Sequence, residues 1–194
     1  MNTTFDHTLI NTPGDALPRP HANCYWLIPG RLLAGEYPAD DDPRVMARQT
    51  QALLDAGVTH CFDLTHESEA LPPYAVSLAQ AAAGRGVTAS TQRFSVADFG
   101  VPSVDGMRRT LAAIDTALGT GGTVYLHCRG GIGRTGTVVG CLLREQGFDA
   151  DAAIAVIRRK WQVMAKRIAA PHSPETAEQR AFIAAWPQRP PFQR

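Results

Sequence analysis

One glycine-rich loop between a strand pattern and a helix pattern constrains the fold of this chain more than any other feature. Residues 127–136 read HCRGGIGRTG. The β-branched and aromatic run at residues 123–126 predicts a buried strand that enters this loop. Apolar residues recur at helical spacing over residues 135–146, and Gly147 ends the pattern. Strand, loop and helix in this order predict an anion site where loop amides and the helix N-terminus converge.

Two side chains of the loop give it a specific chemistry. Cys128 and Arg134 are separated by five residues, and Gly130, Gly131 and Gly133 among them allow a close backbone approach. A helix N-terminus favours the thiolate form of a cysteine, which is the nucleophilic form. The planar guanidinium of an arginine can bind two phosphate oxygens at once. A Walker A loop is excluded, because it needs lysine where Arg134 stands.

The same stretch resembles the active-site loop of the cysteine-dependent protein tyrosine phosphatase superfamily, in which His-Cys is followed by five residues and Arg-Ser/Thr. The resemblance implies that Cys128 is the nucleophile and that Arg134 is catalytic. It further implies that the Thr135 hydroxyl donates to the departing sulfur and that His127 orders the loop. The phosphate-binding residues that it implies are Arg129, Gly130, Gly131, Ile132, Gly133 and Arg134.

A carboxylate upstream is the candidate for the general acid. Residues 95–102, SVADFGVP, resemble the mobile acid loop of the family, with Asp98 lying 30 positions before Cys128 (128 − 98). Val96 and Ala97 stand where classical tyrosine phosphatases have Trp-Pro, as in many dual-specificity and atypical members. The resemblance implies that Asp98 protonates the leaving group and later, as a carboxylate, activates water. The alternative is an Asp that only caps its own turn.

A third segment lies near the C-terminus. Ser173 is a typical N-cap, so we predict that a helix begins at residue 174 and runs to residue 183. Members of the family often carry Gln-Thr-x-x-Gln here, with glutamines that position the hydrolytic water. Thr176 and Gln179 match this pattern, whereas Glu175 replaces the first glutamine. The resemblance implies a water-positioning role for Gln179 and Glu175, and an ordinary solvated helix start is the alternative.

Alternating strand and helix patterns over the rest of the chain predict an α/β fold. We expect a central, mixed but mostly parallel β-sheet flanked by helices, with the phosphate loop between a strand and a helix. The predicted strands are residues 25–28 and 31–34 as a hairpin, 58–64, 87–94 and 123–126. Helices are predicted at residues 43–56 and 73–83, along a face marked by Met107, Leu111, Ile114 and Leu118, and after Asp149.

Length and composition indicate one domain. The chain has 194 residues, 44% of them hydrophobic, and we expect an irregular lead at 1–22, a single catalytic domain at 23–186 and a Pro-rich tail at 187–194. The formal net charge of +1 argues against nucleic-acid binding and stable membrane association. Residues 1–21 lack an apolar stretch typical of a signal peptide. We therefore expect a cytoplasmic monomer without metal or cofactor.

Four cysteines, at positions 24, 61, 128 and 141, show no metal-binding spacing. A disulfide framework is not expected, which is consistent with a reducing compartment. Cys61 or Cys141 could form a reversible disulfide that protects Cys128, as happens in some family members. The alternative is that both are buried structural thiols.

The substrate is predicted from what the loop contains. Arg129 is the basic residue inside it and no lysine is present, a composition that in this family favours phosphotyrosine, with dual specificity as an extension. A phosphoinositide or small phosphomonoester is the second hypothesis, and a non-catalytic phosphate-binding scaffold is the third. Glu67, Glu69 and Tyr74 either border the cleft or decorate the surface. The expected partner is a phosphorylated protein or peptide.

Overall fold

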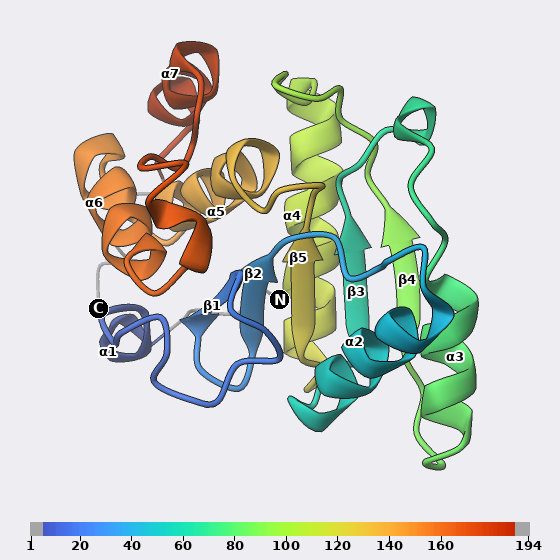
Figure 1. The fold of residues 1–194 in the computed structure, drawn as a ribbon. Helices are drawn as coiled ribbons and strands as arrows, with labels where there is room; N and C mark the ends of the chain where they lie inside the picture. The colour runs from blue at the N-terminus through green and yellow to red at the C-terminus, as the bar shows by residue number, and fades with distance from the viewer. Residues whose placement is uncertain (1–5, 189–194) are drawn as a thin grey trace.

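The computed structural model describes residues 6–188 and is built around a mixed five-stranded sheet (Figure 1). Its strands lie in the order β1-β2-β5-β3-β4. The strands β1 and β2 form an antiparallel hairpin, whereas the pairs β2–β5, β5–β3 and β3–β4 are parallel. The predicted α/β class is confirmed. The strand bounds are β1 (Cys24–Ile28), β2 (Leu32–Gly35), β3 (His60–Asp63), β4 (Ser90–Arg93) and β5 (Val124–His127).

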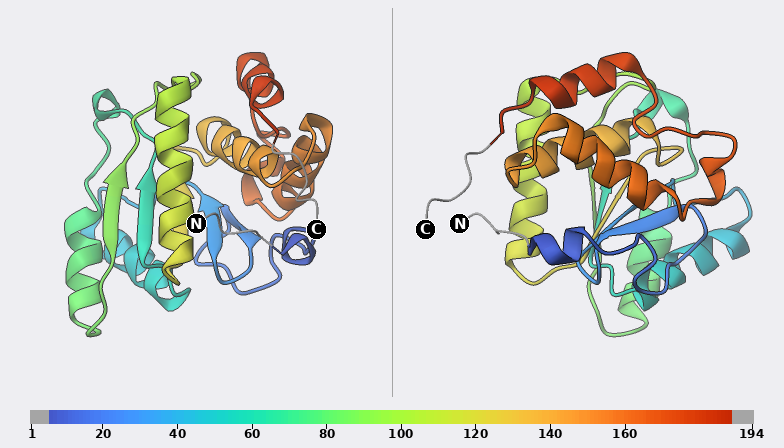
Figure 2. Two further views of the ribbon diagram at one scale, coloured as in Figure 1. Left: turned by 180° about the vertical axis from the view of Figure 1, so that it is seen from behind. Right: turned by 90° about the vertical axis from the view of Figure 1, so that its left-hand side faces the viewer.

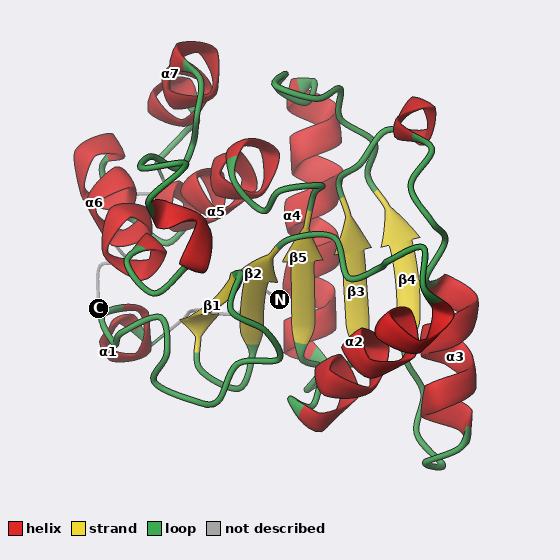
Figure 3. Cartoon of the chain, viewed as in Figure 1, coloured by secondary structure: helices red, strands yellow, loops and turns green. Residues whose placement is uncertain are grey.

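Helices cover both faces of this sheet (Figures 2 and 3). Helix α4 runs along one face, and α2 and α3 pack together on the other. Helices α5, α6 and α7 form a cluster beside α4, next to the β1–β2 edge. The helix bounds are α1 (His7–Ile10), α2 (Pro43–Asp55), α3 (Ala75–Ala83), α4 (Val104–Gly119), α5 (Gly133–Glu145), α6 (Ala150–Trp161) and α7 (Ala177–Ala185), with short 3₁₀ helices η1 (Glu67–Glu69) and η2 (Ala165–Arg167).

The alternation of side chains along β5 divides the core into two layers. Val124 and Leu126 belong to a cluster with α4, α5 and α6, and Tyr125 points into a second cluster with α2 and α3. This is the period of two that a strand buried on both faces produces. Because β5 is fixed from both sides, the loop that leaves its C-terminal end has a rigid base.

Three local predictions differ from the structure. The lead contains the short helix α1, because the Asp6 side chain accepts from the Thr8 amide at 2.8 Å and caps it. Strands β3 and β4 are shorter than predicted, since pairing extends only over four residues of each. Helix α7 begins three residues later than predicted, at Ala177, because Thr176 and not Ser173 is its N-cap. The predicted tail lies outside the described residues beyond Gln188.

Candidate active site

The C-terminal ends of three parallel strands place the candidate residues at one edge of the sheet. Cys128 follows β5, the segment with Asp98 follows β4, and η1 with Glu69 follows β3. Two backbone hydrogen bonds join these strand ends, from the Leu64 amide to the His127 carbonyl at 2.8 Å and from the Val96 amide to the Leu64 carbonyl at 3.1 Å. A pocket of about 360 Å³ opens here. Its lining includes Cys128, Arg129, Gly130, Ile132, Gly133, Arg134, Asp98 and Glu175 from the predicted set, together with Phe99 and Lys166.

The loop between β5 and α5 is shaped for an anion. At the N-cap of α5, Ile132 supplies no side-chain acceptor, whereas Ser103 caps α4 and Asp149 caps α6. The first amides of α5 therefore face the pocket without competition from an N-cap side chain. Gly131 has a φ of 72°, and a Cβ there would lie 2.4 Å from the carbonyl carbon of Gly35. Only glycine fits this close approach.

Cys128 lies at the bottom of the pocket and is 2% exposed. The hydroxyl of Thr135 is buried and has no hydrogen-bond partner among residues 6–188. That hydroxyl is therefore free to donate. The structure leaves the predicted bond from Thr135 to the sulfur unmade.

His127 supports the loop from behind. Its Nε2 atom lies 2.6 Å from the Tyr74 hydroxyl, and both side chains are buried. Burial lowers the pKa of His127 to about 4, although the nearby Asp63 carboxylate opposes this shift. The imidazole is thus neutral at physiological pH and acts as a structural hydrogen-bonding group. Tyr74 consequently does not border the cleft.

Arg134 is held by three acceptor residues on two segments, Glu69 on η1 and Val96 and Asp98 on the loop after β4. Its side chain is 2% exposed. Both terminal nitrogens donate to the Glu69 carboxylate, with Nη2 3.0 Å from Oε2. Nη1 also donates to the Val96 carbonyl at 3.0 Å, and Nη2 to Asp98 Oδ1 at 2.8 Å. Burial opposes its charge, but the hydrogen bond to Glu69 and the proximity of Cys128 raise the pKa of Arg134.

Asp98 caps its own turn and also contacts Arg134. Its Oδ1 accepts from the Phe99 amide at 3.1 Å and so caps its own turn. The same oxygen accepts from Arg134, which turns the carboxylate toward the phosphate loop. Phe99 has a φ of 59°, an unusual conformation for a residue other than glycine. The side chain of Asp98 is 39% exposed, so it is accessible from the pocket.

Glu175 and Gln179 both reach the start of α5. A Cβ on Gly133 would lie 2.2 Å from Glu175 Oε1 and 2.6 Å from Gln179 Nε2. The shared location was predicted, but the reason was wrong, because Glu175 precedes α7 and does not share a helix face with Gln179. Burial, reinforced by Asp98, raises the pKa of Glu175, while Arg134 and the Gly133 amide oppose this.

The side-chain amide of Gln179 makes three hydrogen bonds to the surrounding backbone. Its Oε1 accepts from the Glu175 amide at 3.1 Å and from the Thr176 amide at 3.2 Å. Its Nε2 donates to the Gly100 carbonyl at 3.2 Å. Gln179 is fully buried. Its hydrogen bonds connect the acid loop to the start of α7.

Sequence reasoning missed Lys166 altogether. This residue lies on η2, yet its Nζ reaches the Gly130 carbonyl at 3.4 Å and forms an ion pair with Glu36. No local motif marks it, because its place depends on the packing of the segment after α6. For Glu69 the sequence leaves open whether it borders the cleft or decorates the surface, and no sequence signal indicates its pairing with Arg134.

The remaining predictions concern metals, membranes and cysteines. Residues 6–188 contain no cluster of three or more His, Cys, Asp or Glu side chains suited to a metal ion. No helix within this part of the chain is long and apolar enough to span a membrane. All four cysteines are free and buried, and burial raises the pKa of Cys61 to about 12. Cys141 packs in the same core cluster as Cys128.

Comparisons with known proteins agree with this geometry. The family model described as "PTP-SAK: Swiss Army Knife protein, DSP-PTPase phosphatase domain" matches residues 21–183. The tyrosine-protein phosphatase CDC14 of Candida albicans is 33% identical over 58 residues, which are 29% of this chain and 11% of that protein. The chain thus matches only about a ninth of that relative.

Solved structures share the fold. The crystal structure of a mutant form of Tk-PTP has a TM-score of 0.60 and 26% identity, and covers 83% of this chain and 91% of that one. The structure of PTPMT1 in complex with PI(5)P has a TM-score of 0.60 and 19% identity, with 81% and 90% covered. This chain belongs to the PTP-SAK family of DSP-PTPase phosphatase domains, within the cysteine-based dual-specificity protein tyrosine phosphatase superfamily.

Proposed function

We propose that this phosphatase hydrolyses phosphotyrosine in proteins through a cysteinyl-phosphate intermediate on Cys128. The observation that carries the proposal is that Cys128, Arg134 and Asp98 line one pocket, with Arg134 buried and held by carboxylates. A nucleophile, a bidentate phosphate ligand and a proton donor are the three groups that transfer of a phosphoryl group to cysteine requires.

In the first step the Cys128 thiolate attacks phosphorus and the bond to the ester oxygen breaks. Arg134 Nη2 donates to Asp98 Oδ1 at 2.8 Å in the structure. A phosphate oxygen of the substrate would replace Asp98 as the acceptor of this hydrogen bond. This exchange frees the Asp98 carboxyl to protonate the departing oxygen. The Val96 carbonyl and Glu69 keep the guanidinium in place meanwhile.

In the second step water attacks phosphorus, the S–P bond breaks and the thiolate is restored. Asp98 takes the proton of the water. The unpartnered hydroxyl of Thr135 donates to the sulfur as it departs. Glu175, whose carboxylate lies against Gly133, accepts a hydrogen bond from the water and orients it. Gln179 acts as a positioning residue, since its amide bonds the Gly100 carbonyl of the acid loop and the backbone amides before α7.

The pocket walls support an aromatic phosphoester. Phe99 is 60% exposed and lines the pocket together with Ile132, while Cys128 lies at the bottom. An aryl ring between these apolar side chains would bring its phosphate to the buried sulfur. A short serine or threonine side chain would leave these contacts unmade.

One observation favours the second hypothesis, a phosphoinositide substrate. Lys166 adds a cation to the pocket beside Arg129, although Glu36 pairs with it. The solved complex of PTPMT1 with PI(5)P shows that a protein of this fold binds such a lipid headgroup. We rank the phosphoinositide hypothesis second, because Glu36 already compensates the charge of Lys166.

Comparison of kcat/KM for phosphotyrosine peptides, phosphoserine and phosphothreonine peptides, and soluble phosphoinositides tests the proposal. We expect the highest kcat/KM for phosphotyrosine peptides. The Phe99→Ala variant should lower kcat/KM for phosphotyrosine peptides more than for the other substrates. A higher value for phosphoinositides that falls in Lys166→Gln would contradict it. A Cys128→Ser variant as active as the wild type would exclude the cysteinyl-phosphate mechanism.

A further inference from the structure

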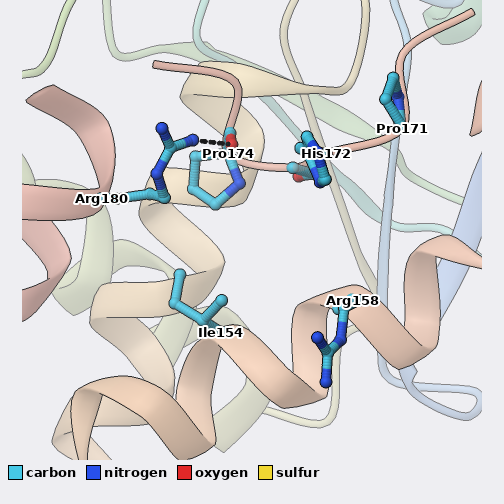
Figure 4. Close-up of a pocket in the computed structure, with 7 residues that line it drawn as sticks. Ile154, Arg158, Pro171, His172, Pro174 and Arg180 are labelled. Atoms are coloured by element: carbon cyan, nitrogen blue, oxygen red, sulfur yellow. Dashed lines mark hydrogen bonds between the residues drawn. The ribbon is translucent and has the colours of Figure 1, made fainter. Parts of the chain in front are cut away.

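A second pocket lies behind the segment that carries Glu175. It has a volume of about 260 Å³, and its lining combines residues of α6, of α7 and of the segment between η2 and α7. Figure 4 shows Ile154 and Arg158 on α6 across from Pro174 and His172 of the connecting segment, with Arg180 of α7 beside Pro174. This pocket adjoins the catalytic pocket, because Pro174 lines it and the next residue, Glu175, lines the catalytic pocket.

The charges of this pocket have one sign. Arg158 and Arg180 are the charged residues of its lining, His172 adds a polar imidazole ring, and none of the seven lining residues is acidic. Within residues 6–188 neither Arg158 nor Arg180 forms an ion pair, and the ring of His172 has no hydrogen-bond partner. Cationic groups gathered in a concave site without counter-charges raise the local concentration of anions.

Arg180 is oriented and still has free donors. Its Nη1 donates to the Pro174 carbonyl at 3.1 Å and to the Glu175 carbonyl at 3.4 Å. These bonds fix the guanidinium against the pocket wall, while Nε and Nη2 have no partner in the described part of the chain. A planar guanidinium with two adjacent free donors suits an oxyanion of phosphate geometry.

We propose that Arg158, His172 and Arg180 form a second phosphate-binding site next to the catalytic pocket. A water molecule occupies about 30 Å³ in the liquid, so the pocket corresponds to roughly eight or nine waters and accommodates one phosphate group with part of its hydration. The ligand is a phosphate oxyanion, either free or carried by a substrate that bears a second phosphate.

The wall between the two pockets is rigid. The Ser173 hydroxyl donates to the Ile132 carbonyl at 2.8 Å, which ties the connecting segment to the N-cap of α5. A Cβ on Gly136 would lie 3.2 Å from the Pro174 nitrogen, so the segment packs directly against α5. Both sites therefore keep a fixed relative position, as recognition of two phosphates on one molecule requires.

Binding of inorganic phosphate tests the site without any turnover, so its outcome is independent of the proposed catalytic function. We expect saturable shifts of the His172 ring resonances in NMR spectra, assigned with a His172→Gln variant. The Arg158→Gln/Arg180→Gln protein should bind phosphate at this site about five- to tenfold more weakly, given the modest strength of exposed charge pairs. The control is Arg44→Gln/Arg109→Gln, which removes the same charge from α2 and α4.

Substrates distinguish the two sources of the phosphate. If a substrate supplies it, the ratio of kcat/KM for a doubly over a singly phosphorylated peptide falls in Arg158→Gln/Arg180→Gln and not in the control. If Arg158→Gln/Arg180→Gln leaves that ratio unchanged but abolishes the His172 shifts with inorganic phosphate, the site binds free phosphate. Wild-type protein whose His172 resonances do not respond to phosphate, or respond equally in the double variant, would overturn the proposal.

Discussion

Replacement of Glu69 by glutamine tests whether this residue positions the phosphate-binding arginine. Glu69 accepts from both terminal nitrogens of Arg134, and the two side chains are 8% and 2% exposed. Glutamine keeps an oxygen for the His66 amide, which Glu69 caps at 2.7 Å, but it removes the charge. A charge-assisted hydrogen bond contributes about 1.5–3 kcal/mol against about 1 kcal/mol for a neutral one. Because a buried cation also loses a partner, we expect a loss of about 2–3 kcal/mol in the free energy of unfolding.

The loss of this partner should also reach catalysis. Arg134 keeps its bonds to Val96 and Asp98, so its side chain shifts and is not released. We expect kcat/KM for an aryl phosphate to fall about tenfold to hundredfold, together with weaker inhibition by inorganic phosphate.

Urea denaturation and steady-state kinetics measure both effects, and Glu67→Gln on the same 3₁₀ helix is the matched control. Glu67 is exposed, so its replacement should change neither quantity. If Glu69→Gln left the stability unchanged and bound phosphate more tightly, Glu69 would be a competitor for Arg134 and the reasoning would be refuted.

Three further predictions concern other ionisable groups. Asp98→Ala should lower kcat for an aryl phosphate by roughly 10² to 10⁴, with Asp105→Asn on α4 as the control in steady-state assays; an unchanged kcat would reject Asp98 as the acid. The folded-state pKa of His127, about 4, lies below the unfolded value of about 6.5, so the unfolded chain binds more protons between these values. Stability is then complete above pH 6.5 and falls by about 3 kcal/mol as the pH drops toward 4, a slope that chemical denaturation should show and that His127→Gln should reduce. Burial lowers the pKa of Lys160 to about 8, and within residues 6–188 its side chain has one hydrogen-bond partner, the Thr12 hydroxyl at 3.4 Å. Lys160→Met should therefore raise the free energy of unfolding at neutral pH by about 1–3 kcal/mol, and a destabilised variant would contradict this.

The sequence predicted the parts of the site that one continuous segment determines. The loop of residues 128–132 lies between β5 and α5 as expected, because a strand, glycines and a helix impose this geometry locally. The fold class was predictable for the same reason, since the strand and helix periods alternate along the chain. Asp98 was predicted from the resemblance of residues 95–102 to the family's acid loop, and the structure places it in the lining of the pocket.

Contacts between distant segments could not be predicted. The pairing of Glu69 with Arg134 spans 65 positions and depends on how η1 packs at the end of β3. Lys166 reaches the pocket only because of the turn that follows α6. The start of α7 was misplaced because Ser173 has the side chain of an N-cap, but its hydroxyl bonds the Ile132 carbonyl instead. In each case tertiary packing decided between local options of similar energy.

The central claim is that the phosphoryl group passes through Cys128. Rapid acid quench of the enzyme during turnover of an aryl phosphate, followed by peptide mass spectrometry, measures this directly. We predict one phosphoryl group on Cys128 in the wild type, a larger fraction in Asp98→Asn, where its hydrolysis lacks a base, and none in Cys128→Ser. Turnover of the aryl phosphate without any phosphorylated Cys128, or with the phosphoryl group on another residue, would contradict the mechanism.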